Sequence, residues 1–370
     1  PTSETIAYES YAKWIKSWRD LPLKLNFWNS VLRAEIKDTK PFIRTSEFLW
    51  QEGHTVHETE EDATQQVEFM LRLYKKFVNE YLALPILTGK KSDKEKFVGA
   101  DYTLTLEGIM PDGKALQMGT SHHLGQNFSK PFEISFLGKD EEQHFAWQTS
   151  WGVSWRLMGA LIMTHGDDKG LILPPKIAPI QIVIIPIYYD DVKKNEILAV
   201  IEDIVAKLDS KNIRSYVDSS DQHTPGWKFN QWEMKGVPIR IEIGPKDLDT
   251  NSLVIVKRNS RDKKSISINQ NPVDQIVKEL DVIQDELFEI AKSKHNDMIS
   301  KSANYKELCE RINNERGFVK VDWCGNRNCE DKVKDETGAD IRLIEDENVN
   351  SVCIVCEKIA TNSVYFAKSY

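Results

Sequence analysis

Four of the five cysteines form two close pairs near the C-terminal end of the 370-residue chain. Cys324 and Cys329 are separated by four residues, Cys353 and Cys356 by two, and Cys353 comes 24 positions after Cys329. Two such pairs with a spacer are typical of a tetrahedral Zn²⁺ site. The alternatives are four unrelated thiols or two disulfides, and disulfides need an oxidising compartment for which the sequence gives no sign. The spacing therefore favours a structural zinc site, because four thiolates leave no position open for water.

Charged and aromatic side chains share faces in two segments with the alternation of β-strands. Arg33 and Glu35 are two positions apart on one predicted strand. A second face, if its segment is fully extended, carries Arg44, Ser46, Phe48, Trp50 and Glu52. Such a combination is typical of a binding site. The alternative is an edge strand whose charged face is exposed to solvent. The two large aromatic side chains make this interpretation less favoured.

Further polar side chains follow a predicted hairpin, namely Gln117, Thr120, His122 and His123. A lone histidine is more often structural than functional, so their spacing alone leaves both interpretations open. His54 and His57 resemble a metal pair, but no third ligand is evident and we discount it. Arg156 precedes an apolar helical run, where its charge would suit a carboxylate or phosphate. The glycine-rich phosphate loops are absent, so phosphate chemistry would rest on arginines and Mg²⁺ over a sheet.

The elements that must position these residues alternate between helical and strand periodicity. The pattern predicts an amphipathic helix over 3–20, an antiparallel strand pair that turns at Asn29-Ser30, and a 24-residue helix capped by Thr59. Strands at 101–109 and 114–120 form the predicted hairpin. Strands and helices on an antiparallel sheet define an α+β first domain, to about residue 177.

Two smaller domains are expected to follow. Residues 178–277 show a strand–helix–strand pattern typical of a small α/β domain, and residues 278–370 hold all five cysteines. The net charge of −8 divides as −3, 0 and −5 over the three segments, so the middle domain is the least acidic. A polyanion partner would then need a local basic face. The sequence contains no run of about 18 apolar residues, the length that a membrane-spanning helix needs.

Several long strings in the sequence resemble the class II aminoacyl-tRNA synthetases in their prolyl form. Residues 41–54 (PFIRTSEFLWQEGH) are similar to motif 2, and 151–156 (WGVSWR) with 165–175 (HGDDKGLILPP) are similar to motif 3. The proline-pocket segments of that family resemble 1–4 (PTSE) and 119–128 (GTSHHLGQNF), and its anticodon-binding domain resembles 224–242. The segment between Arg44 and Arg156 has no room for the bacterial editing insertion. The chain is therefore most similar to the archaeal and eukaryotic cytosolic type.

The resemblance implies ATP-dependent ligation of L-proline to tRNA(Pro) through a prolyl-adenylate, by a cytoplasmic homodimer that uses ATP, Mg²⁺ and structural Zn²⁺. It implies a class II catalytic domain over 1–177 that lacks the upstream motif 1, an anticodon-binding domain over 178–277, and a small α/β zinc-binding domain over 278–370. We expect the 370 residues to be the remainder of a longer chain. The competing hypotheses are a synthetase-like tRNA-binding or regulatory protein without aminoacylation activity, and a synthetase for another amino acid.

The resemblance also assigns residues. Arg44 would hold the α-phosphate and the proline carboxylate, Arg156 the γ-phosphate, and Phe48 the adenine. The positions that match the ATP site are Arg33, Glu35, Arg44, Thr45, Phe48, Gln117, Thr120, Ser154 and Arg156. The positions that match the proline site are Thr2, Glu4, Arg33, Trp50, Glu52, His122, Ser150 and Gly152. The candidates for reading anticodon guanines are Lys228, Glu233, Arg240 and Glu242. Ser46 and Trp155 depart from the family pattern, which usually has arginine and threonine there.

Overall fold

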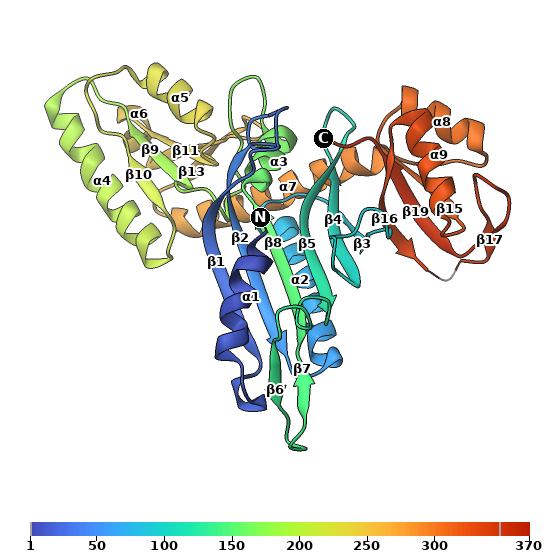
Figure 1. Ribbon diagram of the computed structural model, residues 1–370. Coiled ribbons are helices and arrows are strands. Elements are labelled where there is room, and N and C mark those ends of the chain that lie inside the picture. The colour runs from blue at the N-terminus through green and yellow to red at the C-terminus, as the bar shows by residue number, and fades with distance from the viewer. Residues whose placement is uncertain (1, 348) are drawn as a thin grey trace. The chain divides into compact units, whose positions relative to one another are not determined.

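The computed structural model describes residues 2–347 and 349–370 and divides into two compact units. Unit 1 combines the described parts of Pro1–Val78, Pro85–Ala160 and Lys294–Tyr370, and unit 2 combines Asn79–Leu84 with Leu161–Ser293 (Figure 1). Pro1, the first residue of the string compared with the proline pocket, lies outside the described residues. No helix in the described part of the chain is long and apolar enough to cross a membrane.

Unit 1 is built on a sheet of ten strands within the described residues. In spatial order these strands are β1 (Leu23–Leu32), β2 (Glu47–His57), β8 (Trp147–Ser154), β5 (Ala115–Gly125), β4 (Tyr102–Ile109), β3 (Leu87–Lys90), β16 (Asp340–Asp346), β19 (Asn362–Ala367), β15 (Phe318–Trp323) and β14 (Ile299–Lys301). The first six pair antiparallel throughout, which confirms the predicted antiparallel sheet of the first domain.

The C-terminal strands continue this sheet instead of forming one of their own. Ile344 of β16 pairs with Lys90 of β3, so the sheet passes from the N-terminal strands into the C-terminal segment (Figure 1). Below this joint, Glu107 is fully buried and its carboxylate accepts hydrogen bonds from Lys91 and Arg342. The C-terminal segment and the N-terminal strands therefore share one framework in unit 1.

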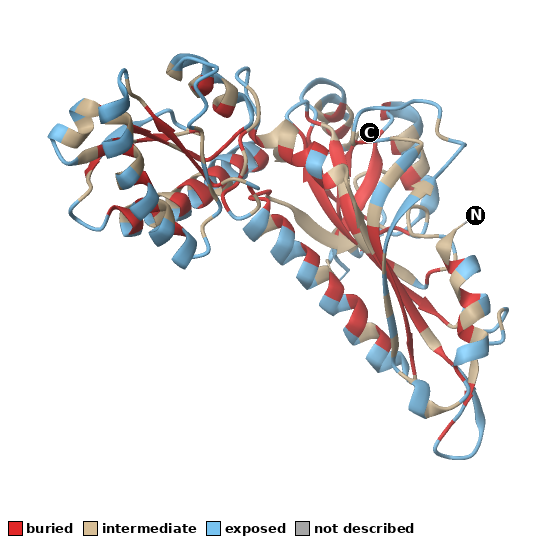
Figure 2. Ribbon diagram, turned by 90° about the vertical axis from the view of Figure 1, so that its left-hand side faces the viewer, coloured by how far each residue is buried: buried red, intermediate tan, exposed pale blue. Residues whose placement is uncertain are grey.

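The helices of unit 1 have one buried and one exposed face, as in any helix packed on a sheet (Figure 2). They are α1 (Ser3–Trp14), α2 (Glu60–Lys76), α8 (Tyr305–Asn314), α9 (Arg327–Thr337) and the 3₁₀ turn Trp18–Asp20; α3 (Arg156–His165) begins in this unit. Thr59 caps α2 by accepting a hydrogen bond from the Asp62 amide at 3.2 Å, as predicted. The helix is shorter than predicted, because a π-helical turn, Phe77–Tyr81, follows it.

The predicted helix over 3–20 ends at Trp14. Ser17 and Asp20 form a capping box that begins the separate 3₁₀ turn, so side chain–backbone hydrogen bonds compete with continuation of the helix. Tyr8 and Tyr11 lie on the buried face of this helix, whereas Ile6 is exposed.

The predicted turn at Asn29-Ser30 is wrong. Strand β1 runs straight through these residues and pairs with β2 from Leu23↔Val56 to Leu32↔Glu47. The reversal lies instead in the loop over 33–46, which places Arg33 and Glu35 after the strand. Arg44 also lies in this loop, in an isolated bridge with Lys40, and not on the extended face expected for it.

Unit 2 is an α/β structure around a five-stranded mixed sheet within the described residues. Its order is β10 (Ser215–Val217), β9 (Ile182–Pro186), β11 (Ile239–Ile243), β12 (Ser252–Lys257) and β13 (Lys263–Ser267), with β9 parallel to both of its neighbours. The helices are α4 (Asp191–Ser210), α5 (Pro225–Met234), α6 (Pro245–Asp249) and α7 (Pro272–Asp297), which ends in unit 1. Every residue of β9 is buried, as its continuous apolar run predicts. The domain boundaries at 177 and 277 stay predictions.

Two short hairpins complete the described elements. They are formed by β6 (Ser135–Leu137) with β7 (Gln143–Phe145), and by β17 (Ser351–Val352) with β18 (Ile359–Ala360).

Candidate active site, unit 2 cleft and cysteine cluster

A cavity of about 310 Å³ lies over the strands of the unit 1 sheet. Its walls come from β2, β5 and β8, the start of α3 and the loop over 33–46. Among its lining residues are the predicted Thr2, Glu4, Arg33, Arg44, Thr45, Phe48, Trp50, Glu52, Gln117, Thr120, His122, Ser150, Gly152, Ser154 and Arg156. Glu35 is the predicted ligand that does not line the cavity, because it sits in an exposed turn of the loop. Residues spread over 155 positions are thus brought to one site.

Arginines form one part of the cavity wall. Arg156 is held at the start of α3 by two hydrogen bonds, from Nε to the carbonyl oxygen of Ile43 at 2.9 Å and from Nη1 to that of Gln117 at 3.1 Å. These bonds fix the guanidinium plane and leave its other donors for a ligand. Burial lowers the pKa of Arg156, and so do the neighbouring Arg33 and Arg44. Arg156 is partly buried, whereas Arg33 and Arg44 are exposed to solvent, and together the three cations provide a site for an anion.

Aromatic rings extend from this cationic wall. Arg33 lies over the ring of Phe48, 5.2 Å from its centroid, and 6.0 Å from that of Trp50. Phe48 and Trp50 pack edge to face at 5.5 Å. Both come from β2, two residues apart, so the period of the strand places them on the same face. A flat ligand could stack between such groups.

Carboxylates form another part of the wall. Glu52 is buried and accepts hydrogen bonds from Ser3 at 2.7 Å and from Nε2 of His54 at 3.0 Å. Burial raises the pKa of Glu52, but the hydrogen bonds from His54 and Ser3 outweigh it, and the pKa falls below its ordinary value. Glu4 lies beside it and accepts a hydrogen bond from Thr2. The site thus offers fixed negative charge to an ammonium group.

Some polar atoms of the cavity are buried and have no hydrogen-bond partner among the described residues. They include Nε1 of Trp50, Oγ of Ser150 and Nε1 of Trp155. Leaving a buried donor unpaired costs about 1–3 kcal/mol. These atoms indicate that a polar ligand completes the site.

Glu95, Phe97 and Thr103 also line the cavity and were not predicted from the sequence. Glu95 and Phe97 lie in the loop between β3 and β4, where the sequence shows no periodicity. Thr103 was detectable, since it falls on the predicted hairpin strand opposite the predicted His122.

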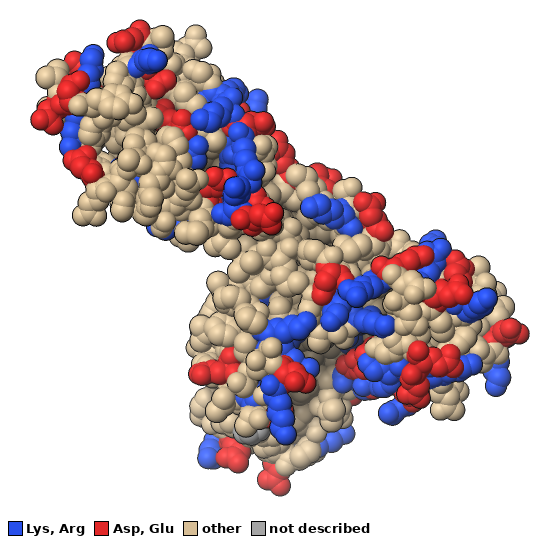
Figure 3. Space-filling view, turned by 90° about the horizontal axis from the view of Figure 1, so that it is seen from above, with Lys and Arg blue, Asp and Glu red and all other residues tan. Residues whose placement is uncertain are grey.

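A second, smaller cleft of about 140 Å³ lies in unit 2. Its lining combines the aromatic Trp232 and the acidic Glu233 with five cations, namely Arg240, Lys257, Arg258, Arg261 and Lys263. Arg240 donates to Glu242 at 2.8 Å, and its guanidinium lies 4.3 Å from the ring centroid of Phe229. Of the four predicted anticodon readers, Glu233 and Arg240 line the cleft, and Glu242 does not. Lys228 is buried and donates to the carbonyl oxygen of Asp218. On the face seen in Figure 3, basic and acidic side chains are intermixed.

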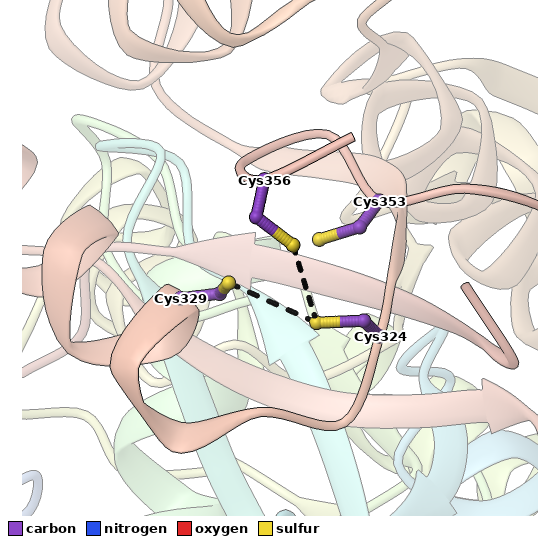
Figure 4. A group of neighbouring side chains, drawn as sticks. All are labelled: Cys324, Cys329, Cys353 and Cys356. Atoms are coloured by element: carbon purple, nitrogen blue, oxygen red, sulfur yellow. Dashed lines mark hydrogen bonds between the residues drawn. The ribbon is translucent and has the colours of Figure 1, made fainter. Parts of the chain in front are cut away.

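The four paired cysteines converge on one point (Figure 4): Cys324 follows β15, Cys329 lies in the first turn of α9, and Cys353 and Cys356 lie between β17 and β18. Their sulfur atoms all lie within 4.8 Å of one another, and Cys324 Sγ is 3.7 Å from those of both Cys329 and Cys356. Four sulfurs at about 2.3 Å from a central ion would be about 3.8 Å apart in a tetrahedron. A backbone N–H of Lys358 lowers the pKa of Cys356 to about 7. No disulfide joins the described cysteines, and the donor set fits Zn²⁺.

Comparisons with known proteins extend these observations. Residues 1–165 match the tRNA synthetase class II core domain (G, H, P, S and T), residues 181–279 the anticodon binding domain, and residues 305–370 the C-terminal domain of prolyl-tRNA synthetase. Sheet, cavity and domain matches define a class II aminoacyl-tRNA synthetase.

The relatives of the chain indicate its family within this class. The proline–tRNA ligase of Cenarchaeum symbiosum is 55% identical over all of this chain and 77% of its own length, and proline–tRNA ligase 2 of Clostridioides difficile is 48% identical over all of this chain and 76% of its own. A crystal structure of prolyl-tRNA synthetase from Cryptosporidium parvum complexed with L-proline and AMP superposes with a TM-score of 0.94 at 41% identity, covering all of this chain and 78% of that one. A second structure of that enzyme, complexed with halofuginone and AMPPNP, gives 0.93 at 40% identity with the same coverage. The chain belongs to the prolyl-tRNA synthetase family.

Proposed function

We propose that this chain catalyses the ATP-dependent ligation of L-proline to tRNA(Pro) through a prolyl-adenylate. The observation that carries the proposal is the cavity of unit 1, which holds arginines, aromatic rings packed edge to face and buried carboxylates around unpaired polar atoms. The structural relative complexed with L-proline and AMP supports both substrate classes.

The first step requires no nucleophile from the protein. An oxygen of the proline carboxylate attacks the α-phosphorus of ATP, a bond to the α-phosphate forms, and pyrophosphate leaves. The protein therefore needs to align two anions and neutralise their charge. We assign this role to Arg44 for the α-phosphate and the carboxylate, and to Arg156 for the γ-phosphate. The backbone anchors of Arg156 support this, because a preorganised cation stabilises the transition state without reorganisation.

The nucleotide would bind along β2 and β5. Phe48 would stack on the adenine and Arg33 would reach the nucleotide, as their positions in the cavity allow. Thr45, Gln117, Thr120 and Ser154 would contact the ribose and phosphates. Glu35 would join this set only through movement of its loop, since the structure places it outside the cavity. Mg²⁺ prefers oxygen ligands and commonly binds through substrate phosphates, so we propose that it enters with ATP.

The amino acid would bind beside the carboxylates. Glu4 and Glu52 would neutralise the secondary ammonium of proline, and Trp50 would contact its ring. Thr2, Arg33, His122, Ser150 and Gly152 would complete the pocket. Burial and fixed hydrogen bonds support the role of Glu52, because its carboxylate is charged before the substrate arrives.

Transfer of the prolyl group to tRNA would depend on unit 2. Arg240 and the carboxylates of Glu233 and Glu242 would read anticodon guanines, since arginine matches the acceptors of guanine and carboxylates match its donors. Lys228 would act indirectly, through its contact with Asp218. The cations of the unit 2 cleft would attract the phosphate backbone, so binding should weaken with salt.

We propose further that Cys324, Cys329, Cys353 and Cys356 hold a structural Zn²⁺. With four thiolates the ion has no open position, so it would stabilise the loops and take no part in the reaction. We also propose that the protein is a cytoplasmic homodimer, with catalytic, anticodon-binding and zinc-binding domains divided near residues 177 and 277.

The decisive experiment is proline-dependent exchange of labelled pyrophosphate into ATP, followed by charging of tRNA(Pro). We expect exchange with proline and ATP, and charging when tRNA is added. Absence of exchange in folded protein would favour a tRNA-binding or regulatory protein. Exchange driven better by another amino acid would refute the substrate assignment.

A further inference from the structure

Three polar side chains that line the cavity form a row across two neighbouring strands. Thr103 of β4 is the register partner of His122 of β5, and Thr120 lies two residues before His122 on the same face. Nδ1 of His122 is 2.9 Å from the hydroxyl of Thr103, and Nε2 is 2.9 Å from the hydroxyl of Thr120. The imidazole thus connects two hydroxyl groups.

The direction of this chain of hydrogen bonds is set at Thr103. Its hydroxyl accepts a hydrogen bond from the backbone N–H of Phe97 at 3.1 Å, and the residue is 1% exposed. A buried hydroxyl must also donate, and Nδ1 of His122 is the acceptor that the described residues offer to it. Nδ1 therefore carries no proton.

His122 is neutral, because burial lowers its pKa to about 3. A neutral imidazole whose Nδ1 accepts must carry its proton on Nε2. Nε2 then donates to the hydroxyl oxygen of Thr120, whose own hydrogen is left for another acceptor. Thr120 lines the cavity, so this hydrogen is available to a bound ligand.

We propose that Thr103 is a positioning residue for adenylate formation, which acts through His122 to fix the Thr120 hydroxyl as a hydrogen-bond donor to a substrate oxygen. This inference rests on the function proposed above. Thr103 itself needs no contact with substrate, because its hydroxyl is occupied by Phe97 and His122. The acceptor oxygen belongs either to proline or to ATP.

A double-mutant cycle tests the proposed coupling. Thr103→Val keeps the side-chain shape but removes the donor, and we expect kcat/KM for pyrophosphate exchange to fall about tenfold. Thr103→Ser should stay within about twofold of the parent protein, because it keeps the hydroxyl. In a Thr120→Val background the effect of Thr103→Val should disappear. An equal loss in both backgrounds would overturn the proposal.

The same variants identify the acceptor. A higher KM for proline in Thr103→Val places the acceptor on the amino acid, and a higher KM for ATP places it on the nucleotide. No change in kcat or in either KM would contradict the proposal.

The histidine tautomer supplies a readout that does not depend on activity. In protein labelled with ¹⁵N-histidine, the signals lost in His122→Gln identify His122. We expect Nε2 protonated in the parent and in Thr103→Ser, and a mixed tautomer in Thr103→Val. Protonated Nδ1 in the parent would overturn the inference, even if Thr103→Val failed to fold.

Thr105→Val is a matched control. Thr105 lies two residues along β4, and its hydroxyl donates to Glu107 at 2.9 Å. This substitution should leave the nitrogen signals of His122 unchanged. A parent protein that shows the expected tautomer but no exchange with proline would refute the proposed function separately from the hydrogen-bond direction.

Discussion

The buried ion cluster of Lys91, Glu107 and Arg342 allows a quantitative test of how the C-terminal segment is held to the sheet. Glu107 is fully buried and its carboxylate accepts from Lys91 Nζ at 2.7 Å and from Arg342 Nε and Nη2 at 3.1 and 3.0 Å. Burial raises the pKa of Glu107, but Lys91 and Arg342 outweigh it and the pKa lies below its ordinary value. The carboxylate therefore stays charged inside the protein.

Replacing Arg342 with Met removes the hydrogen bonds that its guanidinium donates to the Glu107 carboxylate. Breaking one side of a buried ion pair costs about 3–5 kcal/mol, because a charge is left without compensation. Since Lys91 still contacts Glu107, we expect the lower end, about 3 kcal/mol. For a unit of this size that loss lowers the melting temperature by about 6–12 °C.

The assay is thermal and urea unfolding of the full chain followed by tryptophan fluorescence and circular dichroism. Lys90→Met is the matched control, because Lys90 pairs with Glu347 across the same joint at 2.9 Å but in a solvent-exposed position. It should cost at most about 1 kcal/mol. A loss in Arg342→Met no larger than in Lys90→Met would refute the reasoning that burial makes the cluster important.

Four further predictions concern the sites. Arg44→Ala should reduce pyrophosphate exchange at least 100-fold while leaving tRNA affinity within about twofold, because its charge acts on the transferred phosphate; near-normal exchange would exclude that role. Metal analysis of reduced protein should find one zinc per chain, lost in Cys353→Ser and kept in Cys309→Ser, and an unchanged zinc content in Cys353→Ser would disprove the site. The Arg258 guanidinium, 2.6 Å from Asp167, lowers the pKa of that carboxyl well below 3.8. The Asp167→Asn variant should therefore be less stable than the parent above pH 3.8, and this difference in stability should shrink as the pH falls below 3.8. A difference in stability that persists undiminished in acid would contradict this. Alanine should support exchange with a kcat/KM only about 10- to 200-fold below that of proline, since absent methylenes are worth about 1–3 kcal/mol in a pocket; complete exclusion would indicate a polar discriminator.

Local patterns in the sequence were sufficient to predict much of the cavity lining and the cysteine cluster. The period of a strand places Phe48, Trp50 and Glu52 on one face, and the structure brings that face to the cavity. The cysteine spacing likewise predicts the cluster that the structure forms. Both predictions rest on residues close together in the chain, where geometry follows directly from element type.

The errors arise where a distant partner decides the structure. Asn29-Ser30 has the composition of a turn, but pairing with β2 keeps it extended. Arg33 and Arg44 reach the cavity from a loop, so no strand period could place them. Local patterns also cannot predict the pairing of β3 with β16, because the register between distant strands depends on the finished fold.

That joint has a consequence for the order in which the protein can fold as it is synthesised. Lys91 donates to the carbonyl oxygen of Arg342, 251 positions further along the chain. Until the ribosome has released the residues of β16, one edge of β3 has no partner strand, and an open edge invites pairing with other chains. The segment Leu161–Ser293, which is all of unit 2 except Asn79–Leu84, is made during this interval. The nascent chain must therefore keep an incomplete sheet in solution while the segment Leu161–Ser293 is synthesised.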